Sequence, residues 1–170
     1  TPKYEKADCP FEKIQGATVE CGYLVVPEDR GVAQGNTIRV AVARFKATLP
    51  NPAADPIVYL EGGPGGSPLR SYTKSYSAIF GPYNQKREVI LVDQRGTGYS
   101  QPALDCPETT QLALDQLNQV LAPEVADQQY NDSLKVCHDR LVKKGINLGA
   151  YNSAANAADL NDLRSVLGIK

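Results

Sequence analysis

Two glycine-rich turns, each directly following a short apolar run, carry the clearest chemical signal in this chain. Residues 57–60 lead into EGGPGGS (61–67), and residues 88–92 lead into DQRGTGYS (93–100). Glycine permits positive φ and lets backbone N–H groups approach a ligand without a Cβ in the way. N–H groups held in this manner stabilise a negative oxygen, as in an oxyanion hole, or hold a phosphate.

The phosphate alternative fails on the residue types. A Walker A loop requires a lysine after its glycines, and none follows here. A dinucleotide loop could begin at Gly63 and Gly65, but its last glycine position falls on Pro68. A plain surface turn would explain the composition, although not why two adjacent buried strands both end in glycine clusters. The pattern therefore favours a site for a developing negative charge.

The elements that position these turns are predicted from hydrophobic periodicity. Alternating residues predict strands over 17–26 and 37–46, joined as an antiparallel hairpin after an extended lead-in over 1–15. The apolar runs 57–60 and 88–92 predict strands that are buried on both faces. Helices are expected over 69–80, 109–121, 123–143 and 154–167. This alternation of strands and helices indicates an α/β fold.

Length and composition limit the class of protein. The chain has 170 residues, of which 42% are hydrophobic, as expected of one globular domain. Its net charge is -1 and its basic residues form no cluster, so we expect no nucleic-acid partner. The apolar runs are too short to cross a bilayer and no charged-then-apolar leader is present, so we expect neither a membrane span nor a signal peptide in this chain.

Four cysteines occur as two pairs that are local in sequence, Cys9 with Cys21 and Cys106 with Cys137. None forms a C-x-x-C unit, so zinc-ribbon or thioredoxin chemistry is poorly supported. The pairs predict two disulfides and an oxidising compartment; the alternative is four reduced thiols in a cytosolic protein. Because the chain contains a single histidine, His-rich metal sites are excluded, and we expect no metal or cofactor.

Taken together, residues 59–67 and 92–100 resemble the paired signature of the proline iminopeptidase and tripeptidyl aminopeptidase family, which are serine peptidases of the α/β-hydrolase fold. ECGYLVVP (20–27) resembles the N-terminal strand of the secreted branch, and YNSAANAADL (151–160) resembles the helix before the nucleophile strand. The resemblance implies that residues 1–170 are the N-terminal portion of one α/β-hydrolase domain, ending just before that strand. It implies a mixed, mostly parallel sheet with an N-terminal antiparallel hairpin.

The resemblance also implies roles for the glycine turns. Gly62 and Gly63 would present oxyanion donors, with Pro64 and Gly65 shaping the same loop. Asp93 and Arg95 would lie beside the active site and buttress that loop; the alternative is a local ion pair between them.

Glu61 stands where the family often has histidine. Its carboxylate could bind the free amine of a peptide substrate, but we favour a structural pairing with Arg95.

The resemblance places the nucleophile elbow G-x-S-x-G, and the Asp and His that follow it, beyond Lys170. Ser67 and Ser100 lack the final glycine of an elbow, and His138 lies in a polar stretch that predicts a solvated helix. We therefore expect this chain alone to be inactive and its partner to be the remaining C-terminal segment of the same protein. The expected protein is a secreted or periplasmic aminopeptidase acting on a peptide; the alternatives are an esterase or lactonase acting on a small ester, and a non-catalytic binding module.

Overall fold

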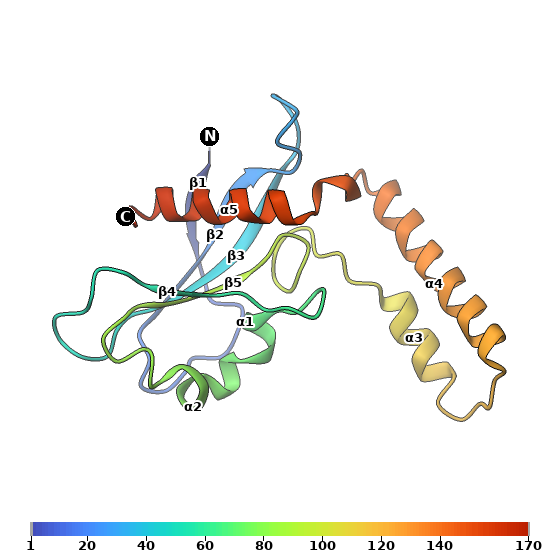
Figure 1. The fold of residues 1–170 in the computed structure, drawn as a ribbon, viewed down its shortest axis with the longest axis horizontal. Coiled ribbons are helices and arrows are strands. Elements are labelled where there is room, and N and C mark those ends of the chain that lie inside the picture. Colours follow the sequence, from blue (N-terminus) through green and yellow to red (C-terminus); the bar gives the residue numbers. More distant parts are fainter. Residues whose placement is uncertain (1, 170) are drawn as a thin grey trace. The chain divides into compact units, whose positions relative to one another are not determined.

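The computed structural model describes residues 2–169, which divide into two compact units (Figure 1). The first unit comprises 2–103 and 150–169, and the second comprises 104–149. The strands, all in the first unit, are β1 (Lys3–Ala7), β2 (Val19–Pro27), β3 (Thr37–Phe45), β4 (Ile57–Tyr59) and β5 (Val89–Asp93). The helices of the first unit are α1 (Pro68–Ser71), α2 (Tyr76–Phe80) and α5 (Ser153–Val166), and those of the second are α3 (Pro107–Asp115) and α4 (Pro123–Lys143). Short 3-10 turns cover Thr73–Ser75 and Leu148–Ala150.

The five strands form one sheet in the order β1-β2-β3-β5-β4, in which only β4 and β5 pair in parallel. The fold is thus mixed α/β, as expected, but the prediction of a mostly parallel sheet is wrong for these residues. Parallel neighbours need a crossover connection, whereas antiparallel neighbours can follow one another through a loop. In the first unit only the connection from β4 to β5 contains helices, α1 and α2, among the described residues.

Strand β1 was not expected, because its five residues are largely charged and read as part of a lead-in. It pairs antiparallel with β2 at the edge of the sheet. Two features hold it there: the Arg39 guanidinium donates to Glu5 Oε2 at 2.6 Å, and Gly22 leaves room for the Tyr4 ring. Polar side chains are usual on edge strands, since they discourage pairing with another chain.

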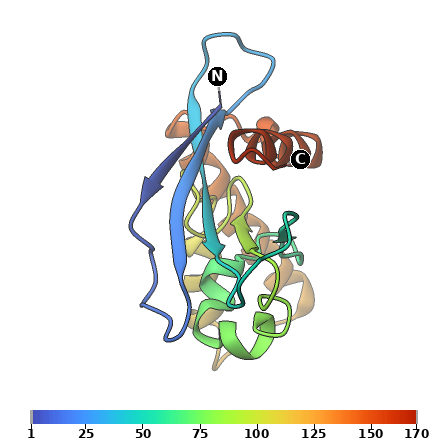
Figure 2. The ribbon, with the colours of Figure 1, turned by 90° about the vertical axis from the view of Figure 1, so that its left-hand side faces the viewer.

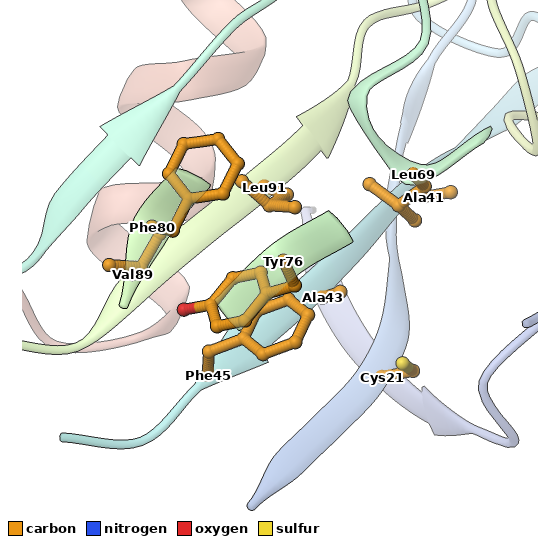
Figure 3. Close-up of a cluster of buried hydrophobic side chains, with 9 residues drawn as sticks. All are labelled: Cys21, Ala41, Ala43, Phe45, Leu69, Tyr76, Phe80, Val89 and Leu91. Atoms are coloured by element: carbon orange, nitrogen blue, oxygen red, sulfur yellow. The ribbon is translucent and has the colours of Figure 1, made fainter. Parts of the chain in front are cut away.

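Apolar clusters cover both faces of the sheet. On β5, Val89 and Leu91 belong to one cluster, and Ile90 and Val92 belong to the other. The first cluster lies against α1 and α2, and its members are Cys21, Ala41, Ala43, Phe45, Leu69, Tyr76, Phe80, Val89 and Leu91 (Figure 3). The second includes Leu163 of α5, which lies beside the strands in Figure 2. The prediction of a doubly covered strand is therefore confirmed for β5.

Strand β4 differs from the prediction because only part of it is buried. Val58 is 44% exposed, whereas Ile57 and Tyr59 pack against the first cluster. β4 is the last strand in the order, with β5 as its only neighbour among residues 2–169. One edge of β4 is therefore unpaired in the described part of the chain.

The helix expected over 69–80 is broken into α1, a 3-10 turn and α2. Thr73 Oγ1 donates to the Leu69 carbonyl at 3.0 Å, and side chains that bond to nearby backbone compete with a regular helix. α4 covers 123–143 as expected and α5 lies within one residue of its predicted range, whereas α3 ends at Asp115 and not at 121 as predicted. None of the helices described has the length and apolar character needed to cross a membrane.

Both expected disulfides are present and confirm the predicted pairing: Cys9 bonds Cys21, and Cys106 bonds Cys137. The second bond joins the residue before α3 to α4 within the second unit. That unit has little core of its own, since α3 contains no buried residue and α4 contains only Cys137 and Leu141. A unit with so few buried residues depends on its covalent link.

We predict that a double Cys106→Ser, Cys137→Ser variant loses structure in residues 104–149. Opening a loop closed across 31 residues costs roughly 3 to 4 kcal/mol in the chain-entropy model. Limited proteolysis should then cut within 104–149 first. The matched control is Cys9→Ser with Cys21→Ser, which should leave 104–149 protected; equal protection of 104–149 in the two variants would contradict the prediction.

Candidate active site

The two glycine-rich turns lie at the same edge of the sheet. β4 and β5 run parallel, with Tyr59 opposite Leu91, so both turns follow the carboxyl ends of adjacent strands. This edge is where open α/β sheets place their ligands. The turns are also bonded directly, because Gln94 Nε2 donates to the Glu61 carbonyl at 2.9 Å.

A single carboxylate, Asp93, joins the two turns. It is completely buried, and its Oδ1 accepts from Ser67 Oγ at 2.8 Å and from the Leu69 N–H at 3.1 Å. Its Oδ2 accepts from the Tyr99 N–H at 2.8 Å. Burial raises the pKa of Asp93, and these hydrogen bonds partly oppose that rise. Asp93 thereby ties the end of the first turn to the second.

Gly98 shows why the second turn requires glycine. Its φ is +56°, and a Cβ there would collide with the Asp93 carboxylate and the Ser67 hydroxyl. Both the backbone conformation and the close approach exclude a side chain. The glycine is thus explained by the packing around Asp93.

The first turn is exposed and leaves free space around its glycines, whereas Gly98 of the second turn is packed against Asp93 and Ser67. Gly62, Gly63 and Gly65 are exposed, and a Cβ on any of them would meet no atom within 4 Å. Gly63 has φ +59° and Gly65 has φ +95°, conformations that favour glycine. The Gly62 N–H donates to the Glu61 carboxylate at 3.3 Å, whereas the Gly63 N–H has no hydrogen-bond partner within residues 2–169. Of the two candidate donors, Gly63 is the one that is available.

Glu61 is bonded to tyrosines and not to a cation. Tyr59 donates its hydroxyl to Glu61 Oε2 at 3.0 Å. A hydrogen bond from Tyr72, followed by the one from Tyr59, holds the pKa of Glu61 below its usual value. The expected pairing of Glu61 with Arg95 is therefore wrong, because short-range hydroxyl donors have taken its place.

Arg95 is buried and forms a bidentate ion pair with Asp159 of α5. Its Nε donates to Oδ2 at 2.7 Å and its Nη2 to Oδ1 at 2.8 Å. Its Nη1 donates to the carbonyls of Glu28 and Ala150, each at 2.7 Å. The alternative of a local pair between Arg95 and Asp93 is therefore also wrong.

The Arg95 network fixes α5 to the turn that follows β5. Arg30 adds a second cation, bonded to Asp159 at 2.5 Å and to Asp162 at 2.7 Å. Sequence reasoning did not identify Asp159. The available signal was an acid four residues before Leu163 in the predicted helix, and therefore on the same helix face as that apolar residue. Buried carboxylates are uncommon without a partner, so this position called for a cation.

The serines of the two turns have structural partners. Ser67 caps α1 by accepting from the Arg70 N–H at 3.1 Å while it donates to Asp93. Ser100 donates to the Asp93 carbonyl at 2.6 Å and accepts from the Ala41 N–H at 2.9 Å. Both hydroxyls are buried and form hydrogen bonds within the protein, so neither is placed to attack a substrate carbonyl.

His138 lies on α4, and 61% of its side chain is exposed. Its Nδ1 lies 3.0 Å from the carboxylate of the adjacent Asp139. This is the solvated helix position expected from the sequence.

Two other features of the described residues include no residue of the turn 61–66. A pocket of about 640 Å³ is lined by residues of 11–15 and 70–77 together with Tyr99, but by none of 61–66. Cys106, Glu108 and Cys137 have the spacing of metal ligands, but both sulfurs are used in the disulfide. Neither feature therefore bears on the candidate oxyanion donors Gly62 and Gly63.

Comparison with known proteins confirms the resemblance to serine peptidases that the two glycine turns carry. No family model matches the chain. It is 28% identical to a tripeptidyl aminopeptidase of Streptomyces coelicolor over 96% of this chain and 31% of that protein. It is 27% identical to the serine protease Hip1 of Mycobacterium tuberculosis, over 94% of this chain and 31% of that protein. It is 42% identical over 60 residues, 35% of this chain, to a probable proline iminopeptidase of Leptolyngbya boryana, of which this covers 17%. The chain thus spans about a third of the length of the first two relatives.

We predict that Asp159→Asn strongly destabilises the first unit. It would leave the Arg95 guanidinium buried without its counter-charge, which costs roughly 3 to 5 kcal/mol. The free energy of unfolding, from denaturant titration, is the measurement. The matched control is Asp55→Asn, which breaks the exposed pair of Asp55 with Arg87 and should change the free energy of unfolding little, because solvent screens that pair. Similar losses in both variants would contradict the role assigned to Arg95.

Proposed function

We propose that this chain is the N-terminal part of a serine peptidase of the α/β-hydrolase fold, in which the turn 61–66 supplies an oxyanion donor. The observation that carries the proposal is the parallel pair β4–β5, whose two turns are joined by Asp93 while the Gly63 N–H stays unpaired. The names of the relatives support a peptidase over an esterase, lactonase or binding module.

The reaction requires a donor of this kind. A serine oxygen attacks the peptide carbonyl carbon, a base takes the serine proton, and the carbonyl oxygen becomes negative. The Gly63 N–H, with Gly62 as the second candidate in the turn, would stabilise that oxygen, together with the N–H after the nucleophile. The protonated base then gives its proton to the leaving amine, and water hydrolyses the acyl-enzyme.

The serine, acid and histidine are proposed to come from the remaining C-terminal segment of a longer protein. Ser67 and Ser100 have structural roles, and the relatives are about three times longer than the chain. The unpaired edge of β4 offers a place for that segment. A strand added there in parallel with β4 would have its carboxyl end beside the two glycine turns. An elbow serine is needed at that position. The disulfides support a secreted or periplasmic location.

The donor role predicts a large effect of Gly63→Pro in the full-length protein that contains this chain. Proline removes the N–H, and the loss of one oxyanion donor lowers turnover by roughly a hundredfold to a thousandfold. The measurement is kcat on a chromogenic peptide amide, with circular dichroism and thermal unfolding to verify the fold.

Gly65→Pro is the matched control for that variant. Both positions have positive φ, so proline conflicts with the backbone equally at each, but only Gly63 is proposed to donate. Gly65→Pro should retain most of the turnover. Equal losses in the two variants would assign the effect to loop distortion and remove the support for Gly63 as a donor.

A further inference from the structure

Glu61 carries a negative charge within the turn that is proposed to stabilise the oxyanion of the reaction. Its Oε1 lies 3.3 Å from the Gly62 nitrogen, within the turn proposed to stabilise the oxyanion. Two like charges at such short range repel, most strongly where water is excluded. An anion in this position therefore hinders the reaction unless a cation accompanies it.

The described residues provide hydrogen bonds to Glu61 but no counter-charge. Its partners are the hydroxyls of Tyr59 and Tyr72 and the Gly62 N–H, all of them neutral. These groups keep the carboxylate ionised and fix its position; the Tyr59 and Tyr72 rings also meet edge to face, with centroids 5.6 Å apart. Arg95, the cation expected here, is bonded to Asp159 instead. Residues 2–169 therefore leave this charge uncompensated, and a substrate with a free ammonium group would supply the positive charge.

Resting on the proposed function, we infer that Glu61 binds the free α-ammonium group of the substrate, with Tyr59 and Tyr72 as the residues that position its carboxylate. The ammonium group neutralises Glu61 at the moment when the neighbouring N–H groups receive the oxyanion. Binding of the free N-terminus of the substrate is thereby coupled to stabilisation of the transition state.

The position of Glu61 also limits the length of the released piece. One residue of extended chain spans about 3.3 to 3.6 Å. An ammonium group one residue from the scissile carbonyl can reach a carboxylate that lies beside Gly62. The ammonium group of an extended tripeptide would lie about 10 Å from that carbonyl, a longer span than a carboxylate beside Gly62 is expected to bridge. We therefore expect release of a single N-terminal residue, in contrast to the activity named for the tripeptidyl relatives.

The test compares three substrates with the full-length protein: alanine p-nitroanilide, its N-acetyl derivative, and trialanine p-nitroanilide. The free amine should raise kcat/KM over the acetylated compound by about ten- to a hundredfold, the range of one charged hydrogen bond. Glu61→Gln should abolish that ratio by slowing the free-amine substrate, while the acetylated substrate, which brings no cation to the carboxylate, should be cleaved at least as fast as by the unmodified protein. Tyr72→Phe, which leaves the carboxylate in place, should reduce the ratio partially, and Glu12→Gln, at an exposed carboxylate elsewhere, should leave it unchanged.

The outcomes separate this inference from the proposed function. If the protein hydrolyses these amides but Glu61→Gln leaves the ratio as in the unmodified protein, Glu61 does not bind the ammonium group and the peptidase assignment stands. Faster cleavage of the trialanine substrate than of alanine p-nitroanilide would overturn the single-residue limit. If none of the amides is hydrolysed, the proposed function itself is overturned.

Discussion

The buried carboxylate of Asp93 is the group around which both glycine turns are built. It receives hydrogen bonds from a helix cap, a helix N–H and the second turn, and Gly98 has no side chain because this carboxylate occupies the space. With its three donors in place, the group is fully paired although it lies at the end of a completely buried strand. The first turn can consequently remain open at Gly63, since its far end is already fixed at Ser67 and Leu69.

Arg95 performs the complementary task on the other side of the same turn. It binds Asp159 through two hydrogen bonds and donates to the backbone carbonyls of Pro27, Glu28 and Ala150, so that α5 and the end of β2 are fixed to the turn. The two charged residues, two positions apart, therefore stabilise different parts of the structure: Asp93 joins the two glycine turns, and Arg95 fixes α5. Neither neutralises the other, and Glu61 is left with neutral donors. A carboxylate in that state is suited to a cationic ligand.

Local pattern predicted the parts of this structure that depend on local chemistry. The alternation in β3, the apolar run of β5, the range of α4 and the cysteine spacing all led to the observed elements. The charged strand β1 was not predicted because its pairing depends on partners in other strands, Gly22 and Arg39. The partner of Arg95 lies 64 residues away, and no local pattern links the two positions. The parallel sheet was expected from resemblance, whereas the order of connections here gives mainly antiparallel neighbours.

The nucleophile is proposed to lie outside residues 1–170. To locate it, the full-length protein is treated with a fluorophosphonate probe, and the labelled residue is identified by peptide mass spectrometry. Such probes react with serines that a base has activated. We expect one labelled serine, located outside residues 1–170, and no label on Ser67 or Ser100, whose hydroxyls are bonded around Asp93. Labelling of Ser67 or Ser100, or of no serine at all, would contradict this expectation.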